Sequence, residues 1–328
     1  MRNNKILVTG GCGYIGSHVV KQLSALRAEV TVIDNLSSGF REFLLNGEEL
    51  IEKSCGDLDS LAKILKGRKF DAAVHFAGSL IVEESTKDPS TYYRNNVANT
   101  LNFLDLLVSL KVPNIVFSST AAVYGNTSET QVSENTPCIP ESPYGHSKLM
   151  VEQIIQDFSK AYGIKSVILR YFNVAGCEAE GRLGIKSANA THLIKVACEA
   201  GTGKRDAITI YGDDYNTRDG SCIRDYIHVE DLASAHVSSL NYLFSGEKSD
   251  IFNCGYGNGY SVKEVLDTFQ KTNNTTLNIK VGPRRPGDIA EITADNKKIL
   301  AAMDWTPKFN DLSIILKDAF RWEQSLSK

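Results

Sequence analysis

The sequence predicts an α/β protein built on a Rossmann-type, doubly wound parallel sheet, with a smaller α/β substrate-binding domain. In the first half of the chain, short runs rich in apolar residues alternate with longer amphipathic stretches. The short runs are nearly continuous in apolar residues, which is typical of parallel strands covered on both faces. After residue 173 the alternation gives way to shorter elements, and this change predicts the second domain.

The elements follow one another in a strand-helix-strand order. Strands are predicted for residues 5–10, 29–34, 50–57, 71–78, 114–120 and 165–173, and helices near 14–27, 59–67, 90–111 and 144–162. A further helix is expected near 190–201, and a strand followed by a helix over 224–240. We therefore assign 1–173 and 222–250 to a large domain, and 174–221 and 251–328 to a small one.

Composition excludes several classes of function. A net charge of −3 provides no basic surface for nucleic acid. No apolar run approaches the roughly 20 residues that span a bilayer, and the start MRNNKILVTGG is unlike a signal peptide. The seven cysteines contain no CxxC pair and no zinc spacing with histidine, so we expect no metal site. Reduced thiols indicate a cytoplasmic protein.

A glycine loop follows the first predicted strand and opens the first helix. In TGGCGYIGSH, residues 9–18, Gly10, Gly13 and Gly16 are spaced by three. Glycines there permit a tight turn and a close backbone approach to a pyrophosphate, while the helix N-terminus supplies free N–H groups. The position between strand and helix predicts dinucleotide binding.

Two carboxylates end the next strands. Asp34 lies 18 residues after Gly16, where a carboxylate accepts hydrogen bonds from both ribose hydroxyls and repels a 2′-phosphate, which favours NAD over NADP. In the alternative interpretation Asp34 only caps the turn DNLSSG. Asp57 is placed to meet the adenine, although an aspartate at a strand end is also an ordinary loop residue.

A tyrosine stands one helical turn before a lysine in YGHSK, residues 144–148. Tyr144 and Lys148 are either simple neighbours on a helix surface or a base and the cation that lowers its pKa. Thr120, at the end of the fifth strand, is either a β-former or a hydroxyl that shares the substrate oxygen. Combined with the glycine loop, the second interpretation predicts that a phenolate deprotonates an alcohol while NAD accepts a hydride.

With these residues the sequence resembles the extended short-chain dehydrogenase/reductase superfamily, and within it the UDP-hexose 4-epimerases. The resemblance covers nearly the whole chain and is carried by VTGGCGYIGSH, VIDNLSSG, HFAGS, FSSTAAVYG, SPYGHSKLMVE, LRYFNVAG, GDDYNTRDGSCIRDYIHVEDLA and PRRPGD. It implies an NAD-dependent isomerase that inverts C4 of UDP-glucose and UDP-galactose through a 4-keto intermediate. Tyr144 would be the base, Lys148 its electrostatic partner and Thr120 the assisting hydroxyl.

The resemblance also implies two sets of binding residues. Around NAD it places Gly10, Gly13, Tyr14, Ile15, Gly16, Asp34, Asn35, Asp57, Leu58, Phe76, Ala77, Asn95, Tyr144, Lys148 and Tyr171. Around the UDP-sugar it places Thr120, Tyr144, Asn173, His192, Leu193, Tyr211, Arg224, Arg285, Asp288 and Ile292. A homodimer through the helices near 90–111 and 144–162 is implied as well.

Four positions depart from the family pattern. Leu80 stands where many members have a lysine near the cofactor, and Thr191 and His192 stand where paired asparagines are common. Ile292 replaces a tyrosine that is frequent in members restricted to non-acetylated hexoses. The smaller side chain predicts that UDP-N-acetylglucosamine and UDP-N-acetylgalactosamine are accepted too.

Three alternatives remain. A nucleotide-sugar dehydratase resembles cases with an Asp–Glu pair directly after the strand-five threonine, where this chain has Ala121 and Ala122. A reductase would release its keto product and consume cofactor. A non-catalytic NAD-binding protein would have no use for the Tyr144, Lys148 and Thr120 set.

Overall fold

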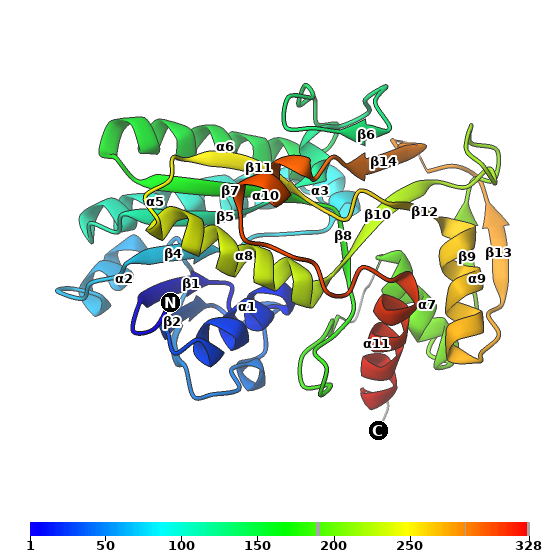
Figure 1. Ribbon diagram of the computed structural model, residues 1–328, viewed down its shortest axis with the longest axis horizontal. Helices are drawn as coiled ribbons and strands as arrows, with labels where there is room; N and C mark the ends of the chain where they lie inside the picture. Colours follow the sequence, from blue (N-terminus) through cyan, green and yellow to red (C-terminus); the bar gives the residue numbers. More distant parts are fainter. Residues whose placement is uncertain (188–190, 286, 327–328) are drawn as a thin grey trace.

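The computed structural model describes residues 1–187, 191–285 and 287–326, and is organised around a seven-stranded sheet (Figure 1). The strand order is β11-β7-β5-β4-β1-β2-β3, and every neighbouring pair is parallel. The strands are β1 (Lys5–Thr9), β2 (Glu29–Asp34), β3 (Glu49–Glu52), β4 (Ala72–His75), β5 (Asn114–Thr120), β7 (Lys165–Tyr171) and β11 (Asp250–Cys254). The predicted fold class is confirmed.

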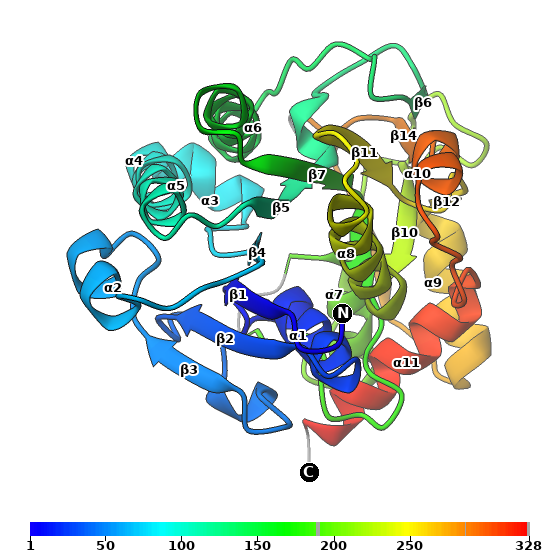
Figure 2. The same ribbon diagram turned by 60° about the vertical axis from the view of Figure 1, so that its left-hand side comes forward.

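Helices cover both faces of this sheet, as Figure 2 shows. One face, with Ile6 and Val8, packs against α1 (Tyr14–Ala25) and α8 (Val229–Phe244). The other face, with Leu7, packs against α2 (Leu58–Ile64), α5 (Asn99–Ser109) and α6 (Pro143–Tyr162). The alternation of Ile6, Leu7 and Val8 between two cores explains why these strands are apolar throughout.

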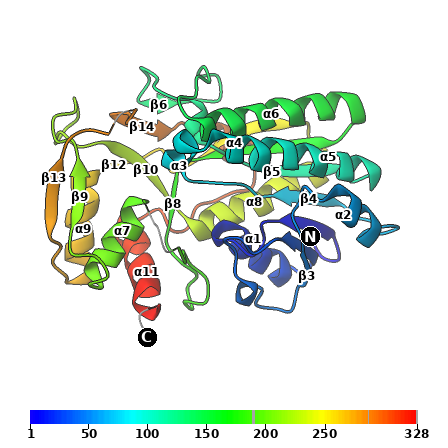
Figure 3. The same ribbon diagram turned by 180° about the vertical axis from the view of Figure 1, so that it is seen from behind.

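The remaining elements form a smaller region at one end of the large sheet, seen from behind in Figure 3. Its strands are β6 (Gln131–Val132), β8 (Asn173–Ala175), β10 (Ile223–His228), β12 (Gly259–Ser261) and β14 (Glu291–Ala294), with β9 (Ile208–Tyr211) and β13 (Ile279–Gly282) as a separate pair. Its helices are α7 (Leu193–Gly201), α9 (Val262–Asn273) and α11 (Leu312–Ser325), whereas α10 (Lys297–Ala302) packs against β11 of the large sheet. The remaining elements are the short helices α3 (Val82–Lys87) and α4 (Pro89–Tyr92), the π-helical segment η2 (Tyr93–Ala98), and the single turns η1 (Arg41–Phe43) and η3 (Ala121–Val123).

The order of the strands creates the site. The chain proceeds from β1 through β2 to β3 on one side and through β4, β5, β7 and β11 on the other, so the direction of winding reverses at β1. Ligands of doubly wound sheets bind at the carboxyl ends of the strands beside such a switch point. Thr9, Asp34, Thr120 and Tyr171 are the last residues of their strands and therefore share this edge.

Several sequence-based boundaries were wrong. The third strand ends at Glu52, because the residues up to Asp57 form a turn and Asp57 caps α2. The helix expected over 90–111 is α4, then a π-helical segment η2 (Tyr93–Ala98), then α5, because a π-turn inserts a residue into the helical ladder. Of the helix expected at 190–201, residue 190 lies outside the described residues, and α7 begins at Leu193.

Residues 222–254 contain the elements that bear most directly on the predicted division into two domains. β10 pairs with β8, β12 and β14 of the smaller region, whereas α8, which follows it directly, packs on the large sheet. β11 starts at Asp250 and pairs with β7, so a boundary at 250 falls inside this strand. The division at 173 and 250 remains a prediction, and residues 327–328, which it includes, lie outside the described part. Within the described part, no helix is long and apolar enough to cross a membrane.

Candidate active site

The glycine loop has the geometry of an anion cradle. Gly10 has φ +69°, in the left-handed region, and the Gly13 N–H donates to the Gly10 carbonyl at 3.1 Å. A Cβ on Gly16 would lie 2.2 Å from the Gly10 oxygen, and one on Gly10 would lie 2.8 Å from the Ala77 nitrogen. Gly13 caps α1 without a side chain, so the first-turn N–H groups stay available to a ligand. The loop therefore fits the pyrophosphate of a dinucleotide.

Asp34, the last residue of β2, binds the backbone of the glycine loop that follows β1. Its buried carboxylate accepts hydrogen bonds from the Cys12 N–H at 2.9 Å and the Leu36 N–H at 2.8 Å. The Leu36 contact means that the capping interpretation of Asp34 is also correct. An ionised carboxylate keeps further lone pairs, so this arrangement leaves acceptors for ribose hydroxyls.

The other predicted cofactor residues line the same edge. Asp57 is the N-cap of α2, accepting from the Ser60 N–H at 3.3 Å, and Leu58 follows it. Ala77 donates to the Thr9 hydroxyl at 3.3 Å, Phe76 is buried beside it, and Asn95 on η2 donates to the Ser79 hydroxyl at 2.9 Å. Tyr14 donates to the Gly176 carbonyl at 2.7 Å, Ile15 is half-buried, and Asn35 is exposed.

Tyr144 and Thr120 are brought together by the start of α6. Ser142 caps the helix by accepting from the Gly145 N–H at 3.1 Å, and Pro143 occupies the first helical position. A Cβ on Gly145 would lie 2.7 Å from the Ala122 oxygen, so glycine allows α6 to approach the turn after Thr120. Thr120 lies beside Tyr144, and its hydroxyl lowers the pKa of the phenol.

Lys148 is almost fully buried, with 2% of its surface exposed. Its Nζ donates to the Ser118 carbonyl at 2.9 Å and lies 4.9 Å from the centroid of the Phe117 ring. Burial lowers the pKa of Lys148 to about 8, and the Glu152 carboxylate opposes the shift. An exposed helix-surface pair is therefore excluded, because both Tyr144 and Lys148 face the interior.

Among the side chains of the protein, Lys148 is not one of the groups that lower the pKa of Tyr144. Burial raises the pKa of Tyr144 above its ordinary value of 10, and the nearby Thr120 hydroxyl opposes this shift. The reason is that the Lys148 ammonium is directed to a backbone carbonyl and its charge is itself disfavoured by burial. The expectation that Lys148 and an oxidised nicotinamide ring together lower the pKa of the phenol stays a prediction, because the second charge belongs to the cofactor.

Tyr171 completes this cluster. It is the cross-strand partner of Thr120, and its hydroxyl contacts the Ser118 hydroxyl. Burial and the neighbouring Tyr144 raise the pKa of Tyr171, so it stays a neutral phenol.

The predicted substrate residues gather beyond β8 and β10. Asn173 donates a hydrogen bond to the Asp225 carbonyl at 3.2 Å. The Arg224 Nη2 atom lies 3.9 Å from Oδ1 of Asp288. Arg285 covers the Tyr211 ring, with its guanidinium carbon 3.7 Å from the ring centroid. Two guanidinium groups at one end of the region suit a diphosphate.

Three of the predicted substrate-binding residues, His192, Leu193 and Ile292, make no polar side-chain contact, within the described part of the chain, of the kind that Asn173 and Arg224 make. His192 is the N-cap residue of α7 without a side-chain cap bond, and its Nδ1 is buried with no hydrogen-bond partner among the described residues. Leu193 is half-buried against the main core. Ile292 is 5% exposed and belongs to an apolar cluster with Ala121 and Phe172, the neighbours of Thr120 and Asn173.

Sequence reasoning missed a polar support under the cluster. Asn96 on η2 accepts from the Ser79 N–H at 2.7 Å and donates to the Ser147 hydroxyl at 3.0 Å, which ties the π-helical segment to α6. A Cβ on Gly78 would lie 3.0 Å from Asn96 Oδ1. The paired asparagines in YRNNVA were the available signal. Leu80, which replaces the usual lysine, is 61% exposed.

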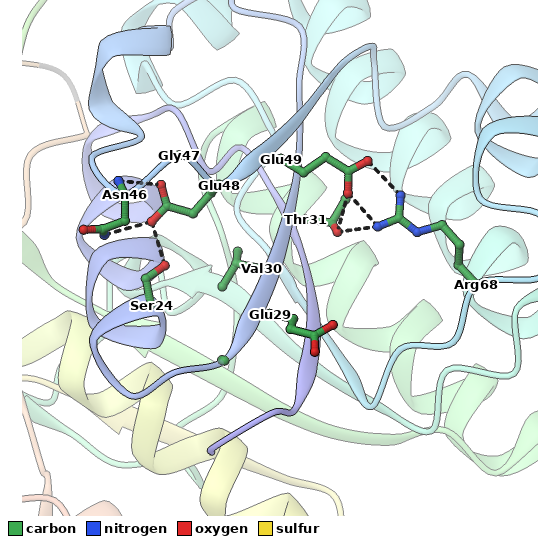
Figure 4. Close-up of a pocket in the computed structure, with 10 residues that line it drawn as sticks. Ser24, Glu29, Val30, Thr31, Asn46, Gly47, Glu48, Glu49 and Arg68 are labelled. Atoms are coloured by element: carbon green, nitrogen blue, oxygen red, sulfur yellow. Dashed lines mark hydrogen bonds and ion pairs between the residues drawn. The ribbon is translucent and has the colours of Figure 1, made fainter.

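A surface hollow of about 390 Å³ lies away from this site (Figure 4). It is lined at the amino ends of β2 and β3, the edge opposite to the glycine loop. Its polar groups bond to one another, since Glu48 accepts from Ser24 and Asn46, and Arg68 donates to Glu49. It is therefore a surface feature separate from the candidate active site.

The chain belongs to the NAD dependent epimerase/dehydratase family, whose pattern it matches over residues 6–255. It is 46% identical to the UDP-glucose 4-epimerase of Azospirillum brasilense, over 99% of this chain and 93% of that protein. It is 44% identical to the UDP-Glc/GlcNAc 4-epimerase of Campylobacter jejuni, whose solved structure has a TM-score of 0.88 over 98% of this chain and 100% of that one. The Brucella ovis UDP-glucose 4-epimerase in complex with NAD is 37% identical, with a TM-score of 0.94 and 98% coverage of each chain. The predicted family and its NAD dependence are confirmed.

Proposed function

We propose that the protein is a UDP-hexose 4-epimerase that interconverts UDP-glucose and UDP-galactose with NAD as a resident cofactor. The observation that carries the proposal is the position of Tyr144 beside Thr120 at the carboxyl edge of the sheet, with Lys148 buried one helical turn further. The similarity to UDP-glucose 4-epimerases over nearly the full chain supports it.

The cofactor would be held by the loop with Gly10, Gly13 and Gly16 at its pyrophosphate and by Asp34 at its adenosine ribose. Asp57 and Asn95 lie along the same edge. When bound, NAD supplies a hydride acceptor that returns the hydride, so that no cofactor is consumed. The remaining contribution comes from the side chains of the protein.

In the proposed mechanism Tyr144 acts as the phenolate that the positive charge of a bound oxidised nicotinamide would stabilise, and it removes the proton of the C4 hydroxyl while Thr120 hydrogen-bonds the same oxygen. C4 becomes a ketone, the hexose turns within the site, and Tyr144 returns the proton after reduction on the opposite face. Lys148 holds positive charge beneath the phenol and is kept in place by the Ser118 carbonyl. Burial of Tyr144 and Lys148 excludes water from the proton transfer.

The nucleotide must stay bound while the hexose rotates. Arg224 and Arg285 are proposed to bind the diphosphate, with Asp288 as the neighbour of Arg224. Tyr211 provides a ring beside Arg285 for the nucleotide, and Asn173, His192 and Leu193 complete the proposed contacts. The unpaired, buried Nδ1 of His192 supports this role, because burial of an unpaired polar atom is costly without a ligand.

The proposal extends to N-acetylated substrates. Ile292 lies within the apolar cluster that borders Thr120 and Asn173, and an aliphatic side chain leaves more room there than a tyrosine. The similarity to a UDP-Glc/GlcNAc 4-epimerase supports this extension. Ile292→Tyr should lower activity on UDP-N-acetylgalactosamine relative to UDP-galactose. Equal activity ratios in the two proteins would remove this part of the proposal.

The test of the main proposal uses purified protein without added NAD. UDP-galactose and UDP-N-acetylgalactosamine are supplied separately, and the C4 epimers are quantified by chromatography. We expect UDP-glucose to form and to reach equilibrium with no build-up of reduced cofactor. A keto product formed in proportion to cofactor would instead indicate a reductase, and loss of water from the sugar a dehydratase.

A homodimer through α5 and α6 is proposed as well. Leu101 on α5 and Met150 on α6 are 40% and 44% exposed, and the two helices lie side by side on one face of the sheet. Exposed apolar side chains on adjacent helices are typical of a contact surface. Sedimentation of wild type and Met150→Glu tests this, with a dimer expected for the first and a monomer for the second.

A further inference from the structure

A buried carboxylate connects the helix of the proposed base to two strands. Glu152 lies one helical turn after Lys148 on α6 and is 1% exposed, and Arg170, near the end of β7, is 4% exposed. The Arg170 Nε and Nη2 atoms donate to the two Glu152 oxygens at 3.0 and 2.6 Å. The Ser119 hydroxyl donates to Oε1 of the same carboxylate at 2.5 Å.

The register of β5 against β7 shows which residues the Glu152 carboxylate binds. Ser119 and Arg170 are direct cross-strand partners on β5 and β7, and the next pair is Thr120 and Tyr171. Glu152 therefore binds the pair immediately before the pair that faces Tyr144. Because a strand alternates its side chains, the residues held by Glu152 and the residues at the reaction lie on opposite faces of the same backbone.

The network continues away from α6. The Arg170 Nη1 atom donates to the Tyr124 hydroxyl at 3.1 Å, and that hydroxyl donates to the Asn253 side chain at 2.6 Å. Asn253 in turn donates to the Val132 carbonyl at 2.9 Å. The segment after Thr120 is thus held in place by the same guanidinium, through side chains that are all buried.

Stability alone does not explain this arrangement. Removing a carboxylate and a guanidinium from water is costly, and packed apolar residues of similar volume often stabilise a core equally well. What the ion pair adds is direction, since a bidentate pair fixes the relative orientation of its two elements.

We propose, on the basis of the function proposed above, that Glu152 is a positioning residue that sets Tyr144 and Lys148 against Thr120 and Tyr171. It does so by binding Ser119 and Arg170, and its negative charge also stabilises the Lys148 ammonium.

The surroundings of Lys148 support the second effect. Burial lowers the pKa of Lys148 to about 8 and Glu152 raises it. On β4, burial and Lys148 lower the pKa of His75 to about 3, so that His75 is neutral. On β7 and α6, burial raises the pKa of Tyr171 and of Tyr144, so both are neutral phenols. Within the described residues, the carboxylate that raises the pKa of Lys148 is therefore Glu152, which lies one helical turn further along α6.

The ring behind the phenol is neutral too. Tyr92 of α4 packs edge-on against Tyr144 at 6.5 Å between centroids, and burial raises its pKa. Its hydroxyl bonds to Ile81 and Glu84.

The experiment compares wild type with Glu152→Gln, which keeps the shape and removes the charge. We expect kcat to fall about tenfold or more with the Kd for UDP unchanged, since a small misplacement of reacting groups has large kinetic effects. We also expect the alkaline limb of the pH profile to move to lower pH, because Lys148 loses its proton earlier without Glu152. The matched control is Glu323→Gln, a carboxylate that is also 1% exposed and ion-paired, with Lys195, and that should leave the alkaline limb in place.

Two further variants keep the proposal falsifiable if Glu152→Gln folds poorly. Ser119→Ala removes one hydrogen bond and should lower kcat a few-fold without moving KM. Glu152→Gln with Arg170→Gln leaves no unpaired charge and should still show the shifted alkaline limb. An alkaline limb and kcat per folded molecule equal to wild type in these variants would overturn the proposal. An inactive wild type would instead contradict the proposed function.

Discussion

Tyr144 and Lys148, four residues apart on α6, titrate in the order opposite to the one that a phenolate base requires. Burial raises the pKa of Tyr144 above 10 and lowers that of Lys148 to about 8, so the ammonium loses its proton first. Without the cofactor, the surroundings of Tyr144 therefore favour its neutral form over the phenolate. We infer that deprotonation of the substrate depends on the positive charge of an oxidised nicotinamide beside the phenol, which confines base catalysis to the cofactor-bound enzyme.

The charge of Lys148 predicts a pH dependence. Below about pH 8 the ammonium is present, and it is lost as the pH rises through that value. We expect kcat/KM of the wild type to decline over this range. Lys148→Arg keeps its charge at all these pH values, so its decline should move to higher pH even though its rate is lower. Identical alkaline limbs in the two proteins would show that another group causes the decline.

Adjacent arginines provide a matched pair for nucleotide binding. Arg285 stacks on Tyr211 in the proposed UDP site, whereas Arg284 pairs with Asp214 and stacks on Tyr215. We expect Arg285→Ala to weaken UDP binding by about 10- to 100-fold, the value of a hydrogen bond to a charged group. Arg284→Ala should leave the Kd within a few-fold. Calorimetric titration with UDP measures both, and equal losses would argue against a specific role of Arg285.

Buried histidines predict a loss of stability in acid. Burial lowers the pKa of His236 from 6.5 to about 4, so between these values the unfolded chain binds a proton that the native protein does not. Stability contributed by this group is therefore present above pH 6.5 and lost as the pH falls, by about 2 kcal/mol between pH 7 and 5. His236→Phe should flatten the pH dependence of the free energy of unfolding. The exposed His146, replaced by Gln, should leave it unchanged.

The glycine cradle predicts a selective loss of cofactor. A Cβ at Gly16 would lie 2.2 Å from the Gly10 oxygen, which forces the loop out of shape. We expect Gly16→Ala to weaken NAD binding on the order of 100-fold, with the Kd for UDP retained. Gly67→Ala is the control, because a side chain there strains the backbone at φ +79° but meets nothing within 4 Å, so it should cost stability without loss of NAD. The NAD content of the purified proteins is the measurement, and wild-type content in Gly16→Ala would contradict the assignment of the loop.

Much of the fold could be predicted because the apolar strands and the glycine loop are local signals. KILVT reads as a strand buried on both faces, and the structure places Ile6 and Val8 in one core and Leu7 in the other. The π-turn at Tyr93–Ala98 could not be predicted, since its residues suit an α-helix and only packing selects the wider turn. β10 reads as one more strand of the main sheet, but its partners β8, β12 and β14 are set by tertiary contacts.

In the candidate site, too, some features could be predicted from the sequence and others could not. Tyr144, Lys148 and Thr120 were readable from spacing and resemblance, and the structure places them together. Their electrostatics were not readable, because burial rather than the neighbouring charge dominates the pKa of Tyr144. Glu152 and Arg170 look like ordinary polar positions in sequence, and only the register of β5 against β7 shows that Ser119 and Arg170 are neighbours that share the Glu152 carboxylate.

The most direct test of the account is the turnover of Tyr144→Phe. This variant should retain NAD and UDP but interconvert UDP-galactose and UDP-glucose about 100- to 10,000-fold more slowly, the usual contribution of a general base. Tyr162→Phe, on the same helix and 57% exposed, is the control and should match wild type. Wild-type turnover in Tyr144→Phe would contradict the claim that this phenol removes the proton.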